Sequence, residues 1–229
     1  MLYKGIFAVG DSFTRGDELA DCTANVSDFS QKTWPALIAK SLNIDYDAVA
    51  IGGRGNHWIS FVSSTDIKLD NVLIVNWTWF ERFDYINNTS DMWTSTHPRH
   101  EDNLNYYFYK NLDNDIWNLH RNLQQIHSTI HLLKQNNIKF IMTCLDPNYK
   151  SKIDNIRTNN FSKLPARRSW TQSINRLHDQ VLPYIVEFEG HTFLEWSHFN
   201  NFKCGPNGHP LEDAHAAAAD YIIKNKLHL

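Results

Sequence analysis

Short apolar runs and amphipathic stretches alternate along most of the chain. The apolar runs are continuous, as is typical of strands buried on both faces of a parallel sheet. They cover residues 5–10, 46–51, 72–75, 139–145 and 191–196. Between them, apolar residues recur at helical spacing over residues 33–42, 113–135, 169–182 and 211–226. This alternation predicts an α/β protein, a flavodoxin-like three-layer α/β/α sandwich with a central, mostly parallel sheet of five strands and its ligand site at their carboxyl ends.

Two segments do not follow the alternation. Residues 79–110 are rich in aromatic side chains and in Asn, Thr, Ser and His without a clear period, which predicts a long loop after the third strand. Residues 146–168 are polar and basic and contain two prolines, which predicts a loop over the end of the fourth strand. Loops at this edge of an α/β sheet often select the substrate. No Pro/Gly/Ser-rich linker divides the chain, so we expect one domain over residues 1–229.

Composition narrows the class of protein. The formal net charge is −3, with 22 Lys plus Arg against 25 Asp plus Glu, so we expect no nucleic-acid partner and no anionic membrane surface. The chain has no apolar run of about 18 residues, the length a membrane span needs. The amino terminus leads directly into the first strand without the features of a signal peptide, which predicts a cytoplasmic protein.

Cysteine and histidine patterns give no sign of a bound metal. The three cysteines are an odd number without CxxC spacing, which favours free thiols over a disulfide framework or a zinc site. The histidines form no HExxH motif. We therefore expect neither a metal nor a cofactor.

The first predicted strand ends in a serine at a turn, in the sequence Gly10-Asp11-Ser12-Phe13-Thr14. A serine hydroxyl attacks a carbonyl only when a neighbouring base accepts its proton and donors stabilise the oxyanion. Taken alone, this triplet is more typical of a helix cap or a turn. Its surroundings favour a nucleophile.

Residues 7–14, 16–19 and 34–37 together resemble the first sequence block of the SGNH, or GDSL-type, hydrolases, and are closest to variants seen in bacteriophage genomes. In that family the serine of this block is the nucleophile, and its own backbone N–H is one oxyanion donor. The resemblance implies both roles for Ser12.

The family's second block is a glycine turn after the second strand, usually Asn-x-Gly-x-x-Gly. Residues 50–56 occupy this place, with Ala50 where asparagine is usual and Gly55 at the position of the oxyanion glycine. Glycine suits that role because a backbone N–H approaches a tetrahedral intermediate only where no side chain intervenes. Asn56 follows directly and is a candidate substrate-binding residue.

The third block, usually Gly-x-Asn-Asp, supplies a side-chain donor after the third strand. The chain reads Val75-Asn76-Trp77-Thr78-Trp79, which places Thr78 at the donor position. A threonine hydroxyl donates one hydrogen bond, with a shorter reach than asparagine. Asn76 is the rival donor, although it should lie within the strand.

Two residues after this block are candidates for substrate binding. Arg82 could hold an acyl or sugar oxygen, and the alternative is an ion pair with Glu81 or Asp84. Trp79 could stack on a sugar ring, and the alternative is packing within the loop.

The last block precedes the final helix. The family's base lies there in an Asp-x-x-His pattern, which His209 matches, but Pro206 stands at the position of the acid. Three arrangements stay open: a Ser-His dyad, a backbone carbonyl acting on the histidine, or Glu212 or Asp213 in place of the acid. A variant makes His215 the base, with Glu212 three residues before it.

These blocks predict a serine ester hydrolase in which His209 takes the Ser12 proton. Gly55, Thr78 and Ser12 would hold the oxyanion. The expected substrate is a small ester or an acylated glycan that loses a group such as acetyl. The alternative is a catalytically impaired glycan-binding or virion-associated structural protein on the same scaffold, released on lysis if a phage encodes it. The sequence leaves the oligomeric state open.

Overall fold

The computed structural model describes residues 3–23, 25, 28–66, 70–88, 90, 92–97, 103–158 and 165–226. The strands are β1 (Gly5–Gly10), β2 (Asp45–Ala50), β3 (Asn71–Trp77), β4 (Phe83–Ile86), β5 (Trp93–Thr96) and β6 (Phe140–Cys144). The helices are α1 (Ser12–Arg15), α2 (Trp34–Leu42), α3 (Asn56–Thr65), α4 (Asn103–Asn111), α5 (Asp115–Gln135), α6 (Tyr149–Thr158), α7 (Pro165–Val181), α8 (Phe193–Phe199) and α9 (Glu212–Asn225), with a 3₁₀ turn, η2 (Leu182–Tyr184).

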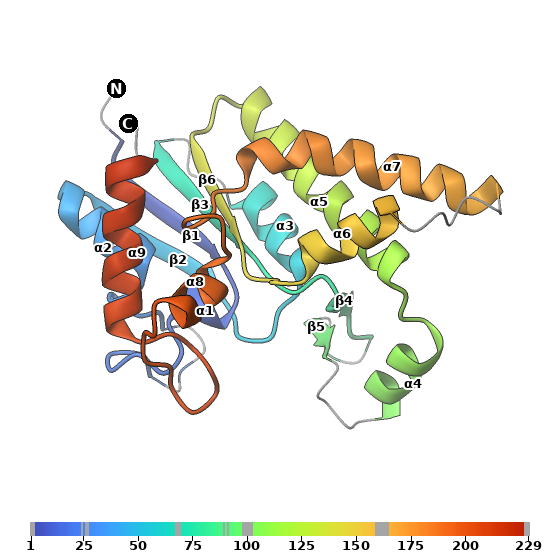
Figure 1. The fold of residues 1–229 in the computed structure, drawn as a ribbon. Coiled ribbons are helices and arrows are strands. Elements are labelled where there is room, and N and C mark those ends of the chain that lie inside the picture. The colour runs from blue at the N-terminus through green and yellow to red at the C-terminus, as the bar shows by residue number, and fades with distance from the viewer. Residues whose placement is uncertain are drawn as a thin grey trace.

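The central sheet is parallel, with the strand order β2-β1-β3-β6. This is the order of flavodoxin-like sheets, in which the chain reverses its direction of winding beside the first strand. Ligands bind such sheets outside the carboxyl ends of the strands at that reversal. In Figure 1 these ends point to the lower edge, where α1 follows β1. The predicted place of the site is therefore the end of β1 and β3.

The predicted fifth strand at residues 191–196 is wrong. Helix α8 begins there instead, because the Thr192 side chain accepts a hydrogen bond from the Glu195 N–H while Glu195 caps Thr192 in return. This reciprocal capping box starts a helix. Within the described residues the sheet has four strands, and a single parallel bridge joins Met142 to Ile185 at its β6 edge.

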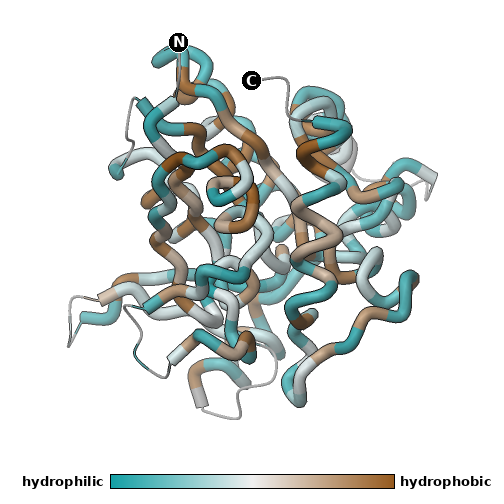
Figure 2. The backbone as a smooth tube through the Cα atoms, turned by 90° about the vertical axis from the view of Figure 1, so that its left-hand side faces the viewer, coloured by the Kyte–Doolittle hydropathy of each residue, from teal (hydrophilic) through white to brown (hydrophobic). Residues whose placement is uncertain are grey.

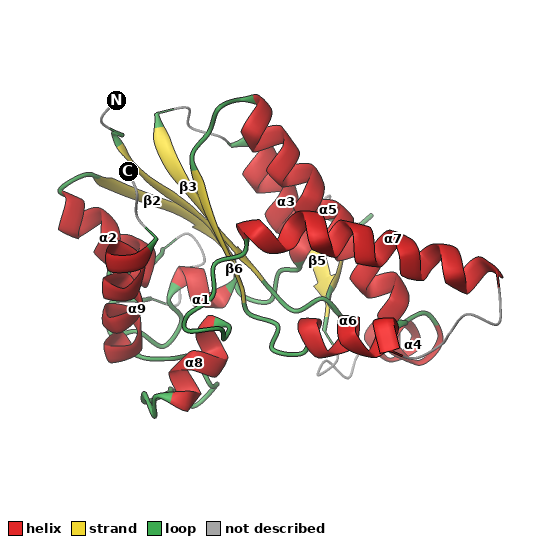
Figure 3. Cartoon of the chain, turned by 45° about the horizontal axis from the view of Figure 1, so that its top comes forward, coloured by secondary structure: helices red, strands yellow, loops and turns green. Residues whose placement is uncertain are grey.

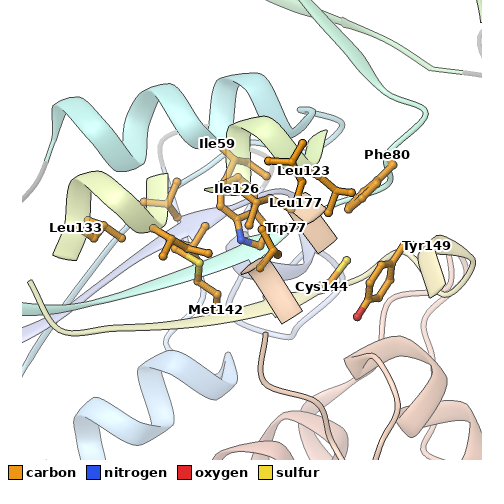
Figure 4. Packing of buried hydrophobic residues seen from close by; sticks show 14 of the residues in the cluster. Ile59, Trp77, Phe80, Leu123, Ile126, Leu133, Met142, Cys144, Tyr149 and Leu177 are labelled. Carbon is orange, nitrogen blue, oxygen red and sulfur yellow. The ribbon is translucent and has the colours of Figure 1, made fainter. Parts of the chain in front are cut away.

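Helices cover both faces of the sheet (Figures 1 and 3). Successive residues of β1 point to opposite faces: Phe7 and Val9 join a core with α3, α5 and α7, whereas Ile6 and Ala8 join a core with α2 and α9. Figure 4 shows the first core packed around Trp77. In Figure 2 the segments of hydrophobic residues gather in the interior, and segments of hydrophilic residues prevail outside. Burial on both faces explains why the strand sequences are continuously apolar.

The segment at residues 79–110 is not the single loop that its sequence predicts. The antiparallel hairpin β4–β5 and helix α4 lie within it, although residues 89, 91 and 98–102 fall outside the described part. Its aromatic residues pack on one another, as Phe83 does on Phe108 with ring centroids 5.0 Å apart. Aromatic residues favour strands, but each strand of this hairpin has only four residues, too few for a clear period-two pattern.

The segment at residues 146–168 is also more ordered than a loop in its described part. Helix α6 occupies most of the described part of this segment, and α7 begins at Pro165. Residues 159–164 fall outside the described part. None of the described helices is long and apolar enough to cross a lipid bilayer.

Candidate active site

Ser12 is the first residue of α1, directly after β1. The helix begins there because the side chain of Asp11 accepts a hydrogen bond from the Phe13 N–H at 3.1 Å. Ser12 is 7% exposed. Its hydroxyl and its N–H make no hydrogen bond with any residue that the structure describes. The hydroxyl is therefore held at the carboxyl edge of the sheet without a partner of its own.

His209 lies in a tight turn before α9, and its ring is held by a carboxylate from the other end of the chain. The His209 Nδ1–H donates to Oε2 of Glu18 at 2.7 Å. An ionised carboxylate only accepts hydrogen bonds, so Nδ1 carries the ring proton and Nε2 presents its lone pair. Nε2 has no partner among the described residues. The His209 ring can therefore accept a proton at Nε2.

The Glu18 carboxylate is enclosed by the turn that carries His209. It also accepts hydrogen bonds from the Asn207 N–H at 2.9 Å and the His209 N–H at 3.2 Å. A Cβ at Gly205 would lie 2.5 Å from Glu18 Cδ, so only glycine admits the carboxylate there. Glu18 itself has a φ of 70°, which is unfavourable for a residue with a side chain. Several contacts therefore hold Glu18 in a strained conformation to place its carboxylate.

The environment of Glu18 favours its ionised form. Burial raises the pKa of this carboxyl, but hydrogen bonds from Asn207 and His209 outweigh burial and leave the pKa below its usual value. A lowered pKa means that the ionised carboxylate stabilises the fold above the ordinary glutamate pKa of 4.5. That contribution is lost as the pH falls through the lowered value.

An aromatic ring connects His209 to the helix of Ser12. The rings of His209 and Phe13 lie 4.8 Å apart between centroids, and Phe13 follows Ser12 in α1. Trp79 packs on the other side, with its ring centroid 5.6 Å from that of Phe13. The structure therefore gathers Ser12, His209 and Trp79 at one edge of the sheet, as their sequence positions predict.

The other candidate acids and the alternative base lie elsewhere. Glu212 accepts hydrogen bonds from the Ala20 N–H at 3.0 Å and from Lys32 Nζ at 3.3 Å. Asp213 is exposed on α9. Neither carboxylate contacts His209 in the described structure, so Glu18 fills the place for which Glu212 and Asp213 were the candidates.

His215 has a structural role. Its Nδ1 accepts a hydrogen bond from the Trp34 N–H at 3.1 Å, which ties α9 to the start of α2. Burial lowers the pKa of His215 to about 3. The His215 imidazole is buried, and its Nδ1 is engaged in this hydrogen bond. It therefore does not fit the alternative in which His215 is the base.

Gly55 does not offer the free N–H that its predicted role needs. Its N–H donates to Oδ1 of Asp84 at 2.7 Å, and a Cβ at Gly55 would lie 2.7 Å from the other oxygen of Asp84. The glycine of this turn that lies against the serine is Gly52, where a Cβ would be 3.6 Å from Ser12 Cβ. No hydrogen bond between described residues uses the Gly52 N–H.

The Thr78 hydroxyl is also occupied. It donates to Oδ2 of Asp11 at 2.7 Å and accepts from Nη1 of Arg82 at 2.8 Å. The single proton of a hydroxyl serves one acceptor, so Thr78 has none left for an oxyanion in this arrangement. The rival donor Asn76 lies in β3, where it accepts from the Thr143 hydroxyl at 2.6 Å and its side-chain nitrogen has no partner.

Arg82 forms a buried ion pair with the residue before the serine. Its Nη1 lies 2.9 Å from Oδ2 of Asp11, and the side chains are 7% and 0% exposed. The guanidinium also stacks over the Trp79 ring, 4.7 Å from its centroid. Arg82 therefore holds the start of α1 in place, and neither Glu81 nor Asp84 is its ion-pair partner.

Replacing Arg82 with leucine is expected to lower the free energy of unfolding by about 3–5 kcal/mol, because Asp11 would stay buried without its counter-ion. Urea denaturation at pH 7 measures this. The control is Arg157→Leu, which removes a pair with Asp179 whose side chains are 35% and 68% exposed. Such an exposed pair contributes about 0–1 kcal/mol. Equal losses in both variants would contradict a special role for the buried pair.

Asn56 is a structural residue and not a surface for substrate. It is fully buried; its side-chain oxygen accepts from the Thr78 N–H at 2.7 Å, and its nitrogen donates to the Thr78 carbonyl at 3.0 Å and to Asn122 at 2.8 Å. The predicted substrate contact at Asn56 therefore has no support in the structure.

No protein-family model matches the chain, and no curated protein matches it in sequence. Solved structures do match its fold. A member of the lipolytic protein G-D-S-L family from Veillonella parvula is similar with a TM-score of 0.51 over 98% of both chains, at 12% sequence identity. TesA is similar with a TM-score of 0.53 over 96% of both chains, at 14% identity. The lipase Lip_vut3 from a goat rumen metagenome has a TM-score of 0.50 over 96% of this chain and 95% of its own, at 11% identity.

These similarities show a fold shared with GDSL-type lipolytic proteins. The residue that sequence reasoning missed is Glu18. Its only sequence signal is a carboxylate in the loop directly after the candidate nucleophile.

Proposed function

We propose that the protein is a serine ester hydrolase of the SGNH type, with Ser12 as nucleophile, His209 as base and Glu18 as the carboxylate that orients the base. One observation carries the proposal: His209, fixed by Glu18 at 2.7 Å, lies against the helix that begins with Ser12. The similarity of the fold to lipolytic G-D-S-L proteins supports it.

The chemical steps follow from the free groups at the site. Nε2 of His209 takes the Ser12 proton as the oxygen attacks an acyl carbonyl, and the Glu18 carboxylate stabilises the imidazolium that forms. The N–H groups of Ser12 and Gly52 hold the oxyanion in this proposal, since the Gly55 N–H and the Thr78 hydroxyl, the predicted donors, are engaged. His209 then returns the proton to the leaving oxygen, and water releases the acid from Ser12.

The surroundings of Ser12 favour a small acyl group such as acetyl. Gly52 lies against the serine, and a Cβ on Gly52 would be 3.2 Å from the Asp17 carboxylate. A charged group and a glycine make a poor wall for a long hydrocarbon chain but leave space for a short one. An acylated carbohydrate is the proposed carrier, with Trp79 as its stacking surface. A cytoplasmic location, and an origin in a bacteriophage, belong to the same proposal.

A fluorophosphonate probe tests the proposal because it reacts only with an activated serine. We expect stoichiometric labelling, with the label on the peptide that contains Ser12, and turnover of p-nitrophenyl acetate. Labelling should fail in His209→Ala. Labelling on another residue, or none with a correctly folded protein, would contradict the proposal.

The second candidate is a catalytically impaired glycan-binding or virion-associated protein on this scaffold. The internal hydrogen bonds of Gly55 and Thr78 favour it, because both occupy groups that the enzyme family uses on the oxyanion. It predicts no labelling of Ser12, together with saturable polysaccharide binding that is lost in Trp79→Ala or Trp93→Ala.

A further inference from the structure

One face of the β4–β5 hairpin is docked on α3, and the other borders a cavity. Directly paired residues share a face, so Asp84 and Ser95 lie on one side, whereas Phe83 and Thr96 lie on the other. The first face is docked on α3: Asp84 accepts hydrogen bonds from the N–H groups of Gly55 and Trp58. Trp93 lies on the same face and packs on His57 and Phe61 of α3, so α3 covers this side of the hairpin.

The second face is apolar and borders a cavity of about 690 Å³. Phe83, Tyr85 and Thr96 form its floor, α4 forms one side and Trp117 of α5 closes an end. This volume is within the range of sites that hold small ligands, about 300–1,000 Å³. Because strand residues alternate in direction, the cavity lies on the side of the hairpin away from Asp84 and Gly55.

Helix α4 and Leu112, the residue directly after it, present an incompletely covered apolar row to this cavity. Leu104, Phe108 and Leu112 follow one another at four-residue spacing, which puts them on one side of the helical turn. Phe108 is 6% exposed, whereas Leu104 and Leu112 at either end are 52% and 59% exposed. At 1.5 Å per residue the row is about 12 Å long. The apolar surface is thus elongated and uncovered at both ends.

Most polar groups near the cavity are paired within the protein; among the described residues the Tyr85 hydroxyl is an exception. The Thr96 hydroxyl contacts the Tyr109 hydroxyl at 3.2 Å and the Phe83 carbonyl at 3.3 Å. Arg121 lies over the Phe83 and Trp117 rings and donates to the Arg82 carbonyl at 2.8 Å. None of the described residues that line the cavity carries a charge. A sugar bound here would leave most of its hydroxyl groups without partners, which is costly, whereas a hydrocarbon needs none.

We propose that this cavity binds a linear, uncharged hydrocarbon chain. The described residues that line the cavity are uncharged, which favours an apolar ligand. The length of the row formed by Leu104, Phe108 and Leu112 favours an extended chain over a compact ring. The proposal concerns a site separate from Ser12 and does not depend on ester hydrolysis. It assigns Phe83, Tyr85 and Phe108 to an apolar ligand, whereas Trp79 is not among the residues that line the cavity.

Calorimetric titration of the full-length Ser12→Ala protein with 1-hexanol, 1-octanol and 1-decanol tests the proposal. Using this variant keeps its outcome separate from any esterase activity. We expect saturable binding of one alkanol per chain, with an affinity that rises about fourfold for each added methylene. Leu104→Asp and Leu112→Asp should each weaken binding at least about tenfold, because each puts a charge beside the chain.

The matched control is Leu42→Asp, at a leucine that is 36% exposed on α2, which should bind like the parent. Absence of saturable binding, affinity independent of chain length, or equal affinity in Leu104→Asp would overturn the proposal. Displacement of the alkanol by cellohexaose would assign the cavity to a sugar instead. A dimer that Leu104→Asp dissociates would show that a second copy of the chain covers this face, and would equally overturn it.

Discussion

Replacing Ser12 with alanine is expected to lower the turnover of p-nitrophenyl acetate by at least about 10³-fold. The hydroxyl is the only group at this edge of the sheet that the proposal uses as a nucleophile, and a methyl group cannot replace it. What activity remains would come from water attack with the oxyanion donors and His209 still in place. Initial rates at saturating substrate, with purified wild type and variant side by side, measure the loss.

The structure makes Ser12→Ala a clean test. Because the Ser12 hydroxyl makes no hydrogen bond with the described residues, its removal leaves no protein group unpaired. The melting temperature should stay within the range of the wild type. Ser63→Ala is the matched control, since Ser63 is another buried serine whose hydroxyl lacks a partner, and it lies on α3. Wild-type turnover in Ser12→Ala, or an equal loss in Ser63→Ala, would remove Ser12 from the mechanism.

The strands and long helices could be predicted because their signal is local. The first strand begins and ends at the predicted residues, Gly5–Gly10, because a strand buried on both faces has to be apolar throughout. Residues 191–196 show where the same reasoning fails. They are apolar enough for a strand, but the reciprocal cap between Thr192 and Glu195 makes a helix more stable.

The sequence predicted where the candidate site residues lie, at the ends of the strands, but not which hydrogen bonds they make. Ser12, Thr78 and the glycine turn do follow β1, β3 and β2. Which hydrogen bonds they make depends on Asp84, in a hairpin that the sequence did not reveal, and on Arg82 just before it. The bond between Gly55 and Asp84 spans 29 positions of sequence and leaves no periodic trace.

Glu18 is the clearest case of a long-range contact. It meets His209 across 191 positions of sequence, whereas the family pattern directs attention to residues close before the histidine. Pro206 occupies that nearby position. In three dimensions the carboxylate comes instead from the loop after α1, and Gly205 leaves the space that admits it. In the proposed mechanism, one short segment at the start of the chain therefore supplies both the nucleophile and the orienting acid.

Glu18→Gln is expected to lower kcat by about 10²- to 10⁴-fold. Glutamine has the same shape and can still accept the Nδ1–H of His209 through its oxygen, but it lacks the negative charge that stabilises the imidazolium in the transition state. The pH profile of kcat/KM should change as well, because a negative charge has been removed from the site. Rates from pH 5 to pH 9 with p-nitrophenyl acetate measure both effects.

Two further variants separate an orienting role of Glu18 from a structural one. Glu18→Asp keeps the charge on a shorter side chain and should recover part of the lost kcat, which a purely structural defect would not allow. Glu212→Gln makes the same chemical change at a carboxylate that pairs with Ala20 and Lys32, and should leave both kcat and the pH profile unchanged. If Glu212→Gln reproduced the loss while Glu18→Gln did not, the acid would have to be sought on α9. If neither variant changed kcat or the profile, His209 would act without a carboxylate, as a dyad with Ser12.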